Sequence, residues 1–140
     1  MNELKKQVKE SFRMEMIGTG IYHALSRQYK KSPEISNSLK EFSQQEEMHG
    51  KLFKQYYKKT FGKFIKGESF WQFAGRAAAI VMRPLSLETK LKKIGAAESQ
   101  AVFRIEKALA GGEDTGYHKI IRRILPDEKA HAALHGQLYP

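Results

Sequence analysis

The chain has 140 residues, in which Lys and Arg outnumber Asp and Glu by 25 to 15, giving a formal net charge of +10. Hydrophobic residues make up 41% and charged residues 29% of the chain, which fits one folded domain and argues against disorder. The absence of cysteine excludes disulfides, thiolate-bound zinc, cysteine-ligated iron–sulfur clusters and cysteine nucleophiles. The basic excess raises the hypothesis of a polyanionic partner.

The residues from Met1 to Lys9 are polar and basic, and no apolar signal core follows them, so we expect a cytoplasmic protein. The most apolar stretch, 70–82, is too short and too interrupted by Arg76 to span a bilayer. We therefore expect no transmembrane segment, and a single domain over 1–140.

Apolar residues recur at helical spacing in four long segments, and no stretch shows a sustained strand-like alternation. The sequence predicts helices at about 2–30, 33–60, 86–110 and 114–138. Ser32 before Pro33 and Ser86 before an acidic first turn are typical helix starts, and Gly111 and Gly112 are a helix stop. The predicted fold class is all-α.

The links between these helices differ in length. Short links predict two antiparallel hairpins, and a long crossover at about 61–85 joins the hairpins. One long crossover is the connectivity of a ferritin-like four-helix bundle. We interpret its apolar part, 70–82, as a short helix packed over the bundle or against a second subunit, with an interfacial membrane anchor as the alternative. The role of this segment stays open.

The motif Glu-x-x-His occurs twice, as Glu46 to His49 and as Glu128 to His131. Residues three apart on a helix share a face, so the carboxylate and the imidazole can bind one metal ion. Either motif alone is weak evidence, because many such pairs are ordinary surface residues.

Hairpin geometry strengthens the prediction, because residues equidistant from a turn lie at the same height. Reflection through the first turn places Glu46 beside Glu15, and reflection through the second places Glu128 beside Glu98. Both of the neighbouring glutamates lie among apolar or small residues, where a lone buried carboxylate is unfavourable.

The two halves of the chain repeat this pattern. The spacing from Glu15 to Glu98 is 83 residues, and the spacings from Glu46 to Glu128 and from His49 to His131 are both 82. Four carboxylates and two imidazoles facing inward from four helices form a carboxylate-bridged di-metal site. Oxygen-rich ligands with one His per metal suit iron better than zinc or copper, and manganese is the alternative to iron.

Three further residues bear on the predicted site. Gly18 and Gly95 lie three residues from predicted ligands and lower helix propensity, which suggests that space is needed there. Pro126, two residues before Glu128, predicts a kink or a bulge in the last helix.

On these residues the chain resembles the ferritin-like, rubrerythrin-type di-iron proteins over nearly its full length. The resemblance implies that the metal ligands are Glu15, Glu46, His49, Glu98, Glu128 and His131. It further implies that Glu46 and Glu128 bridge the metals and that Glu15 and Glu98 are terminal ligands. Tyr22, seven residues after Glu15, matches a tyrosine often found near the metals in that family.

Two departures from the family pattern stand out. These 140 residues contain no cysteine to form a rubredoxin-type site, so we expect electrons to come from an external donor protein. The seventh carboxylate of rubrerythrins has no counterpart, since Gly95 and Ala101 stand one turn on either side of Glu98. No role is assigned to His23 or His118.

The resemblance implies two iron ions and redox chemistry with oxygen or peroxide, as in a peroxidase or ferroxidase-like oxidoreductase connected with oxidative stress. Alternatives are ferritin-like iron storage or a DNA-associated mini-ferritin in a larger assembly, a small di-iron hydroxylase, and a metal-stabilised bundle that binds a polyanion. We expect a homodimer or a higher homo-oligomer.

The predicted site also changes the interpretation of the charge. When the four acids assigned to the site are left out, 25 basic and 11 acidic residues remain. The net charge of the remaining surface is then nearer +14. Several of these bases follow one another near the end of the second helix and in the crossover: Lys54, Lys58, Lys59, Lys63 and Lys66. A solvated lysine face is the default interpretation, and acidic redox partners, nucleic acid and lipid head groups are the alternatives.

Overall fold

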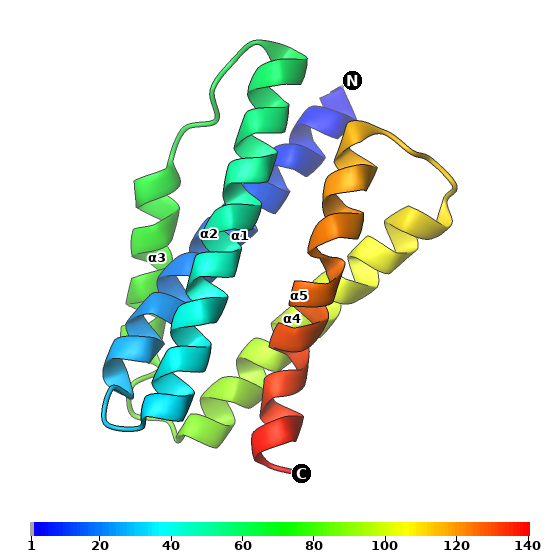
Figure 1. Cartoon of the computed structure of the whole chain (residues 1–140). Helices are drawn as coiled ribbons and strands as arrows, with labels where there is room; N and C mark the ends of the chain where they lie inside the picture. The colour runs from blue at the N-terminus through cyan, green and yellow to red at the C-terminus, as the bar shows by residue number, and fades with distance from the viewer. Residues whose placement is uncertain (1) are drawn as a thin grey trace. The chain divides into compact units, whose positions relative to one another are not determined.

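The computed structural model describes residues 2–140, which form five helices (Figure 1). They are α1 (Asn2–Gln28), α2 (Pro33–Phe61), α3 (Glu68–Val81), α4 (Leu87–Ala110) and α5 (Gly116–Leu138). No β-strand occurs within residues 2–140, so the predicted all-α class is confirmed. The chain divides into two compact units, of which the first ends at Val81 and the second comprises Met82–Pro140.

The helix ends differ from the predicted ones by up to two residues. The first helix ends at Gln28, and α5 begins at Gly116 because Thr115 is its N-cap. The Thr115 hydroxyl accepts a hydrogen bond from the backbone N–H of His118 at 3.3 Å, a cap that the sequence analysis did not identify.

In the first unit, α1 and α2 form an antiparallel hairpin (Figure 1). Ser32 is the N-cap residue of α2 and is followed by Pro33, the first residue of the helix, but the Ser32 hydroxyl makes no capping hydrogen bond. The fixed φ of proline and the backbone bond from Ser36 N–H to the Ser32 carbonyl, 2.9 Å, begin this helix instead. At the other end Gly62 adopts a left-handed φ of 72° and its N–H bonds the Lys58 carbonyl.

The third helix packs against α1 at unusually short backbone distance. A Cβ added at Gly20 would lie 2.0 Å from the Gln72 carbonyl oxygen, and one added at Gly75 would lie 2.1 Å from the Ile17 carbonyl oxygen. Any side chain at either position would force the two backbones apart, so the pair of glycines fixes how α3 lies on α1. The predicted short helix in the crossover is thus present, and it packs on the first helix.

The outer face of α3 remains apolar and exposed. Phe70 and Phe73 are each 62% exposed, and Ile80 and Val81 are also exposed. Within residues 2–140 no helix is long and apolar enough to cross a membrane.

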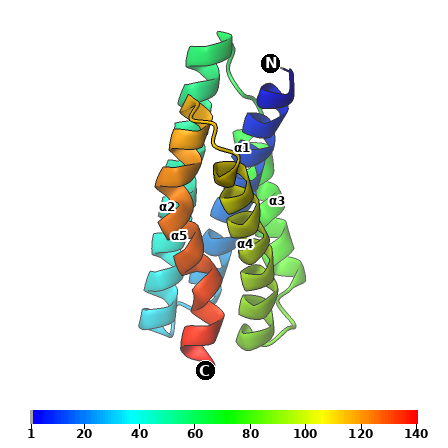
Figure 2. The same ribbon diagram turned by 90° about the vertical axis from the view of Figure 1, so that its right-hand side faces the viewer.

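The second unit is the antiparallel hairpin of α4 and α5 (Figure 2). Ser86 caps α4 as predicted, since its hydroxyl accepts from Thr89 N–H at 3.2 Å. Buried Leu91 on α4 and buried Ile121 and Ile124 on α5 supply apolar packing.

Pro126 lies inside α5, which remains α-helical from Gly116 to Leu138 without a π-type segment. A bulge at this proline, one of the two predicted outcomes, is therefore absent from the helix. Because proline has no N–H, the carbonyl four residues earlier, on Arg122, loses its normal helical donor.

Candidate metal centre

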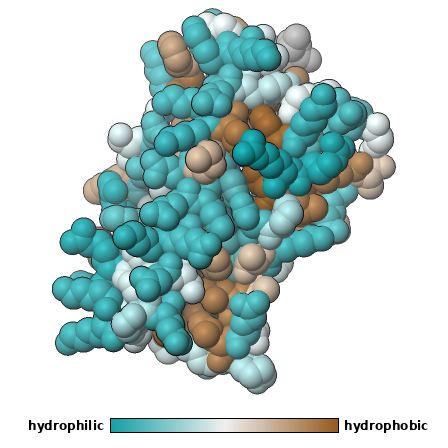
Figure 3. Space-filling view, viewed as in Figure 1, coloured by the Kyte–Doolittle hydropathy of each residue, from teal (hydrophilic) through white to brown (hydrophobic). Residues whose placement is uncertain are grey.

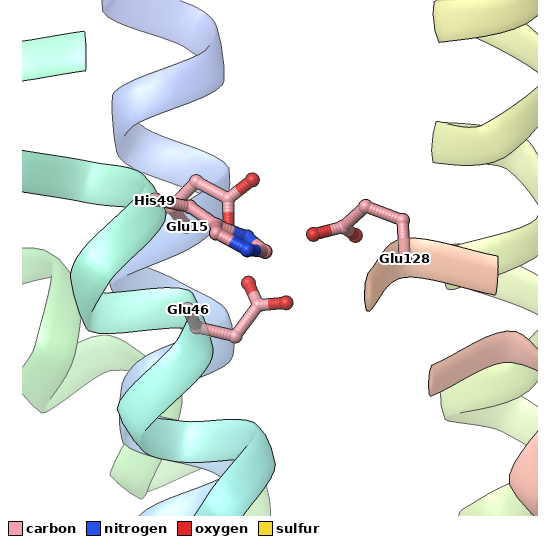
Figure 4. Close-up of side chains that lie close together, drawn as sticks. All are labelled: Glu15, Glu46, His49 and Glu128. Carbon is pink, nitrogen blue, oxygen red and sulfur yellow. The ribbon is translucent and has the colours of Figure 1, made fainter. Parts of the chain in front are cut away.

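Three predicted ligands of the first unit come together. Glu15 on α1 and Glu46 and His49 on α2 each offer one ligand atom, and these atoms lie within 4.8 Å of one another. The Nδ1 atom of His49 is 3.4 Å from Oε2 of Glu15. Figure 4 shows the three side chains pointing toward one another from the two helices. All three residues are buried, with exposed fractions of 7% or less.

Glycine at position 18 makes room for the Glu46 carboxylate. A Cβ added at Gly18 would lie 2.6 Å from Oε2 of Glu46 and 3.1 Å from its Cδ. Real Cβ atoms do not approach oxygen this closely, so alanine here would displace the carboxylate. The prediction that space is needed at Gly18 is therefore confirmed.

A second glycine supports the same hairpin. A Cβ added at Gly50, the residue after His49, would lie 2.1 Å from the Met16 Cε atom. Glycine therefore lets the Met16 side chain pack directly beneath α2. Met16 is fully buried and follows Glu15, so this contact holds the two helices together beside the ligands.

Two buried hydroxyls make hydrogen bonds next to the ligands, and one of these bonds joins α2 to α1. The Thr19 hydroxyl donates to the Glu15 carbonyl at 2.7 Å, and the Ser43 hydroxyl donates across to the Thr19 carbonyl at 2.9 Å. Because Ser43 is three residues before Glu46, this bond fixes the register of α2 on α1 near the ligands. Neither Thr19 nor Ser43 was predicted from the sequence. The sequence pattern that could have indicated them is a hydroxyl residue within one helical turn of each glutamate.

The second unit holds a matching triad. Glu98 on α4 and Glu128 and His131 on α5 also place one ligand atom each within 4.8 Å of one another. The Nδ1 atom of His131 is 3.7 Å from Oε1 of Glu98. Both units thus direct the same imidazole nitrogen at the glutamate of the neighbouring helix.

The two halves differ around their triads. The spacing of the repeat places Val102 and Leu125 where the first half has Thr19 and Ser43, so the second half has no equivalent hydroxyl bridge. A Cβ added at Gly95 would lie 3.5 Å from the nearest atom, a carbonyl oxygen, which is ordinary contact. The prediction that Gly95 provides needed space was therefore wrong.

Tyr22, His118 and His135 lie outside the two triads. Tyr22 is 1% exposed and packs edge-on against Phe42 at a centroid distance of 5.5 Å, about two helical turns along α1 from Glu15. His118 belongs to the start of α5, where its Nδ1 is 2.6 Å from the Thr115 hydroxyl. His135 faces Glu88 at 3.8 Å.

The chain is thus an all-helical protein with a Glu, Glu, His triad in each half. The Rubrerythrin family model matches residues 6–139, and the chain belongs to this family of ferritin-like di-iron domains. The comparison with curated proteins and the comparison with solved structures found no match.

The donor atoms fit the iron that the family implies. Each triad offers two carboxylates and one imidazole, a set rich in oxygen and free of thiolate, which suits iron or manganese. The absence of a side chain at Gly18 preserves the position of one of these carboxylates. Among residues 2–140, the clusters able to hold a metal contain only the six predicted residues.

Proposed function

We propose that this protein is a di-iron oxidoreductase of rubrerythrin type that reacts with oxygen or peroxide. The observation that carries the proposal is the repeated triad, in which each half of a rubrerythrin-family chain brings two carboxylates and one imidazole within 4.8 Å. Ordinary surface glutamates and histidines would not be expected to repeat in both halves at spacings of 82 and 83 residues.

In the proposed centre the six ligands would hold a pair of iron ions, as the family resemblance implies. Glu15 and His49 would hold one ion, and Glu98 and His131 would hold the other. The carboxylates of Glu46 and Glu128 would bridge them, as the family resemblance implies. Two iron ions when bound can each supply one electron, so that an O–O bond accepts two electrons at one place.

The protein's own side chains prepare this centre. Five of the six ligands are buried and Glu98 is half-buried, which limits their contact with water, and the carboxylates offset the positive charge that a metal pair would bring into the interior. Each imidazole must be neutral and must carry no proton on the nitrogen that binds metal; its Nδ1 atom faces the glutamate of the neighbouring helix. The hydroxyl of Ser43 holds the register between α1 and α2, which keeps the three ligands of the first half in place.

Metal analysis of the purified protein tests this proposal. Protein from iron-supplemented cells should carry about two iron ions per chain. Glu98→Ala should lower this content, whereas Glu106→Ala, an exposed glutamate two turns along the same helix, should not. Less than about one metal ion per chain in the unmodified protein, with Glu98→Ala indistinguishable from it, would refute the di-metal centre.

The reaction itself is tested by rapid mixing. The anaerobic ferrous protein should be oxidised by peroxide or by oxygen, and comparison of the two rates identifies the oxidant. Tyr22→Phe keeps the ring that packs on Phe42 and removes the hydroxyl, so a slower oxidation at unchanged iron content would support a role for Tyr22 near the metals.

Molecular size separates this function from iron storage. We propose a homodimer or a small homo-oligomer, since the exposed phenylalanines of α3 favour burial against a second copy. Storage requires a shell of many subunits, so a particle of that size would refute the proposal in favour of a ferritin-like role.

A further inference from the structure

Positive charge is concentrated at one end of the α1–α2 hairpin. Residues 2–13 and 51–66 contain ten Lys or Arg and two Glu, whereas residues 16–48 contain four of each sign. Because the helices are antiparallel, the two basic segments lie at the same end of the first unit. This set, called the basic end, comprises Lys5, Lys6, Lys9, Arg13, Lys51, Lys54, Lys58, Lys59, Lys63 and Lys66.

Two contacts join the basic segments of the two helices. The Lys5 ammonium lies 5.3 Å from the centre of the Phe61 ring, and the Lys9 ammonium lies 5.7 Å from the Tyr57 ring. Both lysines are on α1 and both rings are on α2. A depression on α2 and the segment that follows it is lined by four more lysines, by Gln55 and by exposed Phe64. Hydrophilic side chains cover α2 on the face shown in Figure 3.

The basic end begins directly beside the proposed ligands. Lys51 is two residues after His49, and a row of aromatic residues at four-residue spacing runs from His49 toward the end of α2: Phe53, Tyr57 and Phe61. Phe53 and Tyr57 are buried, and the rings of Tyr57 and Phe61 are 4.9 Å apart. The distance along the helix from His49 to Tyr57 is about 12 Å.

We propose that the basic end is the docking surface for an acidic one-electron carrier protein, which delivers electrons to the proposed centre, whose ligands Glu15, Glu46 and His49 lie on the same two helices. The inference rests on the proposed di-iron function, because that function needs an external reductant in a chain without cysteine. In each encounter one electron leaves the carrier, which becomes oxidised, and one ferric ion of the centre is reduced.

The chemistry of the surface favours a transient protein partner over nucleic acid. Nine of its ten bases are lysines, which are hydrated point charges suited to steering rather than to bidentate phosphate recognition. The single arginine, Arg13, lies over the Trp71 ring at 4.8 Å. Short-lived redox complexes use small, polar, charge-complementary surfaces of this kind.

A charge-reversal variant tests the proposal. Lys51→Glu/Lys59→Glu/Lys63→Glu changes three exposed lysines of the basic end. The matched control, Lys30→Glu/Lys31→Glu/Lys40→Glu, makes the same charge change on exposed lysines at the opposite end of the hairpin.

Two measurements use an acidic [2Fe–2S] ferredoxin as the probe. The first is binding of labelled ferredoxin to the metal-free chain, and the second is the second-order rate of reduction of the iron-loaded chain. At low salt the basic-end variant should lose about tenfold or more in both, and the control should change by less than about threefold. The difference should disappear at high salt. If charge reversal prevents folding, the same three lysines changed to Gln should give a smaller loss of the same kind.

Two outcomes would overturn the proposal. Equal losses in the two variants would mean that net charge, not this surface, controls the encounter. Tighter binding of a single-stranded oligonucleotide than of ferredoxin at physiological salt, abolished by the basic-end variant, would assign the surface to nucleic acid.

The di-iron proposal can fail separately from the docking proposal. A chain that takes up no iron but binds ferredoxin at the basic end refutes the metal centre and retains the docking surface. Hexaammineruthenium(II), a cationic reductant that is not attracted to the basic end, should reduce both loaded variants at least as fast as the unmodified protein.

Discussion

Replacement of Gly18 by alanine should separate stability from metal binding. Glycine inside a helix is about 1 kcal/mol less favourable than alanine. The added Cβ would lie 2.6 Å from Oε2 of Glu46. That oxygen is the end of a flexible side chain, so it can move without disrupting the helices. We therefore expect the metal-free protein to gain about 1 kcal/mol in its free energy of unfolding, roughly 3 °C in Tm.

The same displacement should weaken metal binding. Relief of the contact moves the carboxylate oxygen by nearly 1 Å, well beyond the tolerance of about 0.2 Å on metal–ligand distances. We expect iron affinity to fall by about tenfold or more, comparable with the effect of losing a supporting contact to a ligand. At saturating iron a tenfold loss removes about 1.4 kcal/mol of linked stabilisation, so Gly18→Ala should be no more stable than the unmodified protein when iron is present.

Calorimetry with and without ferrous iron, together with anaerobic iron titration, measures both effects. Gly95→Ala is the matched control, because a Cβ there meets its nearest atom at 3.5 Å, and it should add helix stability without altering iron uptake. Normal iron affinity in Gly18→Ala would refute this reasoning. It would mean that Glu46 can bind metal in another orientation.

Two further substitutions test local contacts by denaturant unfolding of the metal-free protein. Ser43→Ala removes the buried bond to the Thr19 carbonyl and should lower the free energy of unfolding by about 1 kcal/mol with an unchanged m-value; no loss would mean that this bond does not hold the register of α2. Ser86→Ala should cost about 1 kcal/mol, and Ser32→Ala, whose hydroxyl makes no capping bond, only a few tenths; equal costs would contradict the cap assignment.

The sequence by itself predicted the all-α class, the two hairpins and the pairing of residues within each triad. Helical periodicity is a local property, and an antiparallel turn fixes which residues lie at one height. These two rules alone brought Glu15 to Glu46 and Glu98 to Glu128. The internal repeat supported the ligand assignment independently, because the same residue types recur at nearly the same spacing in both halves.

The sequence could not decide features that depend on how closely atoms of neighbouring helices approach one another. Gly18 and Gly95 look alike in the sequence, yet only Gly18 stands against a ligand carboxylate. Ser32 looks like a cap and is not one, whereas Thr115 is a cap that went unnoticed.

The placement of α3 required the tertiary structure as well. Its contact with α1 depends on a carbonyl oxygen meeting a glycine on the facing helix, at Gly20 and at Gly75. Periodicity records which face of a helix is apolar, but the distance between two backbones is set jointly by both surfaces. For that reason the sequence determined which residues of this protein are candidate ligands, and only the packed helices decided which neighbours hold them in position.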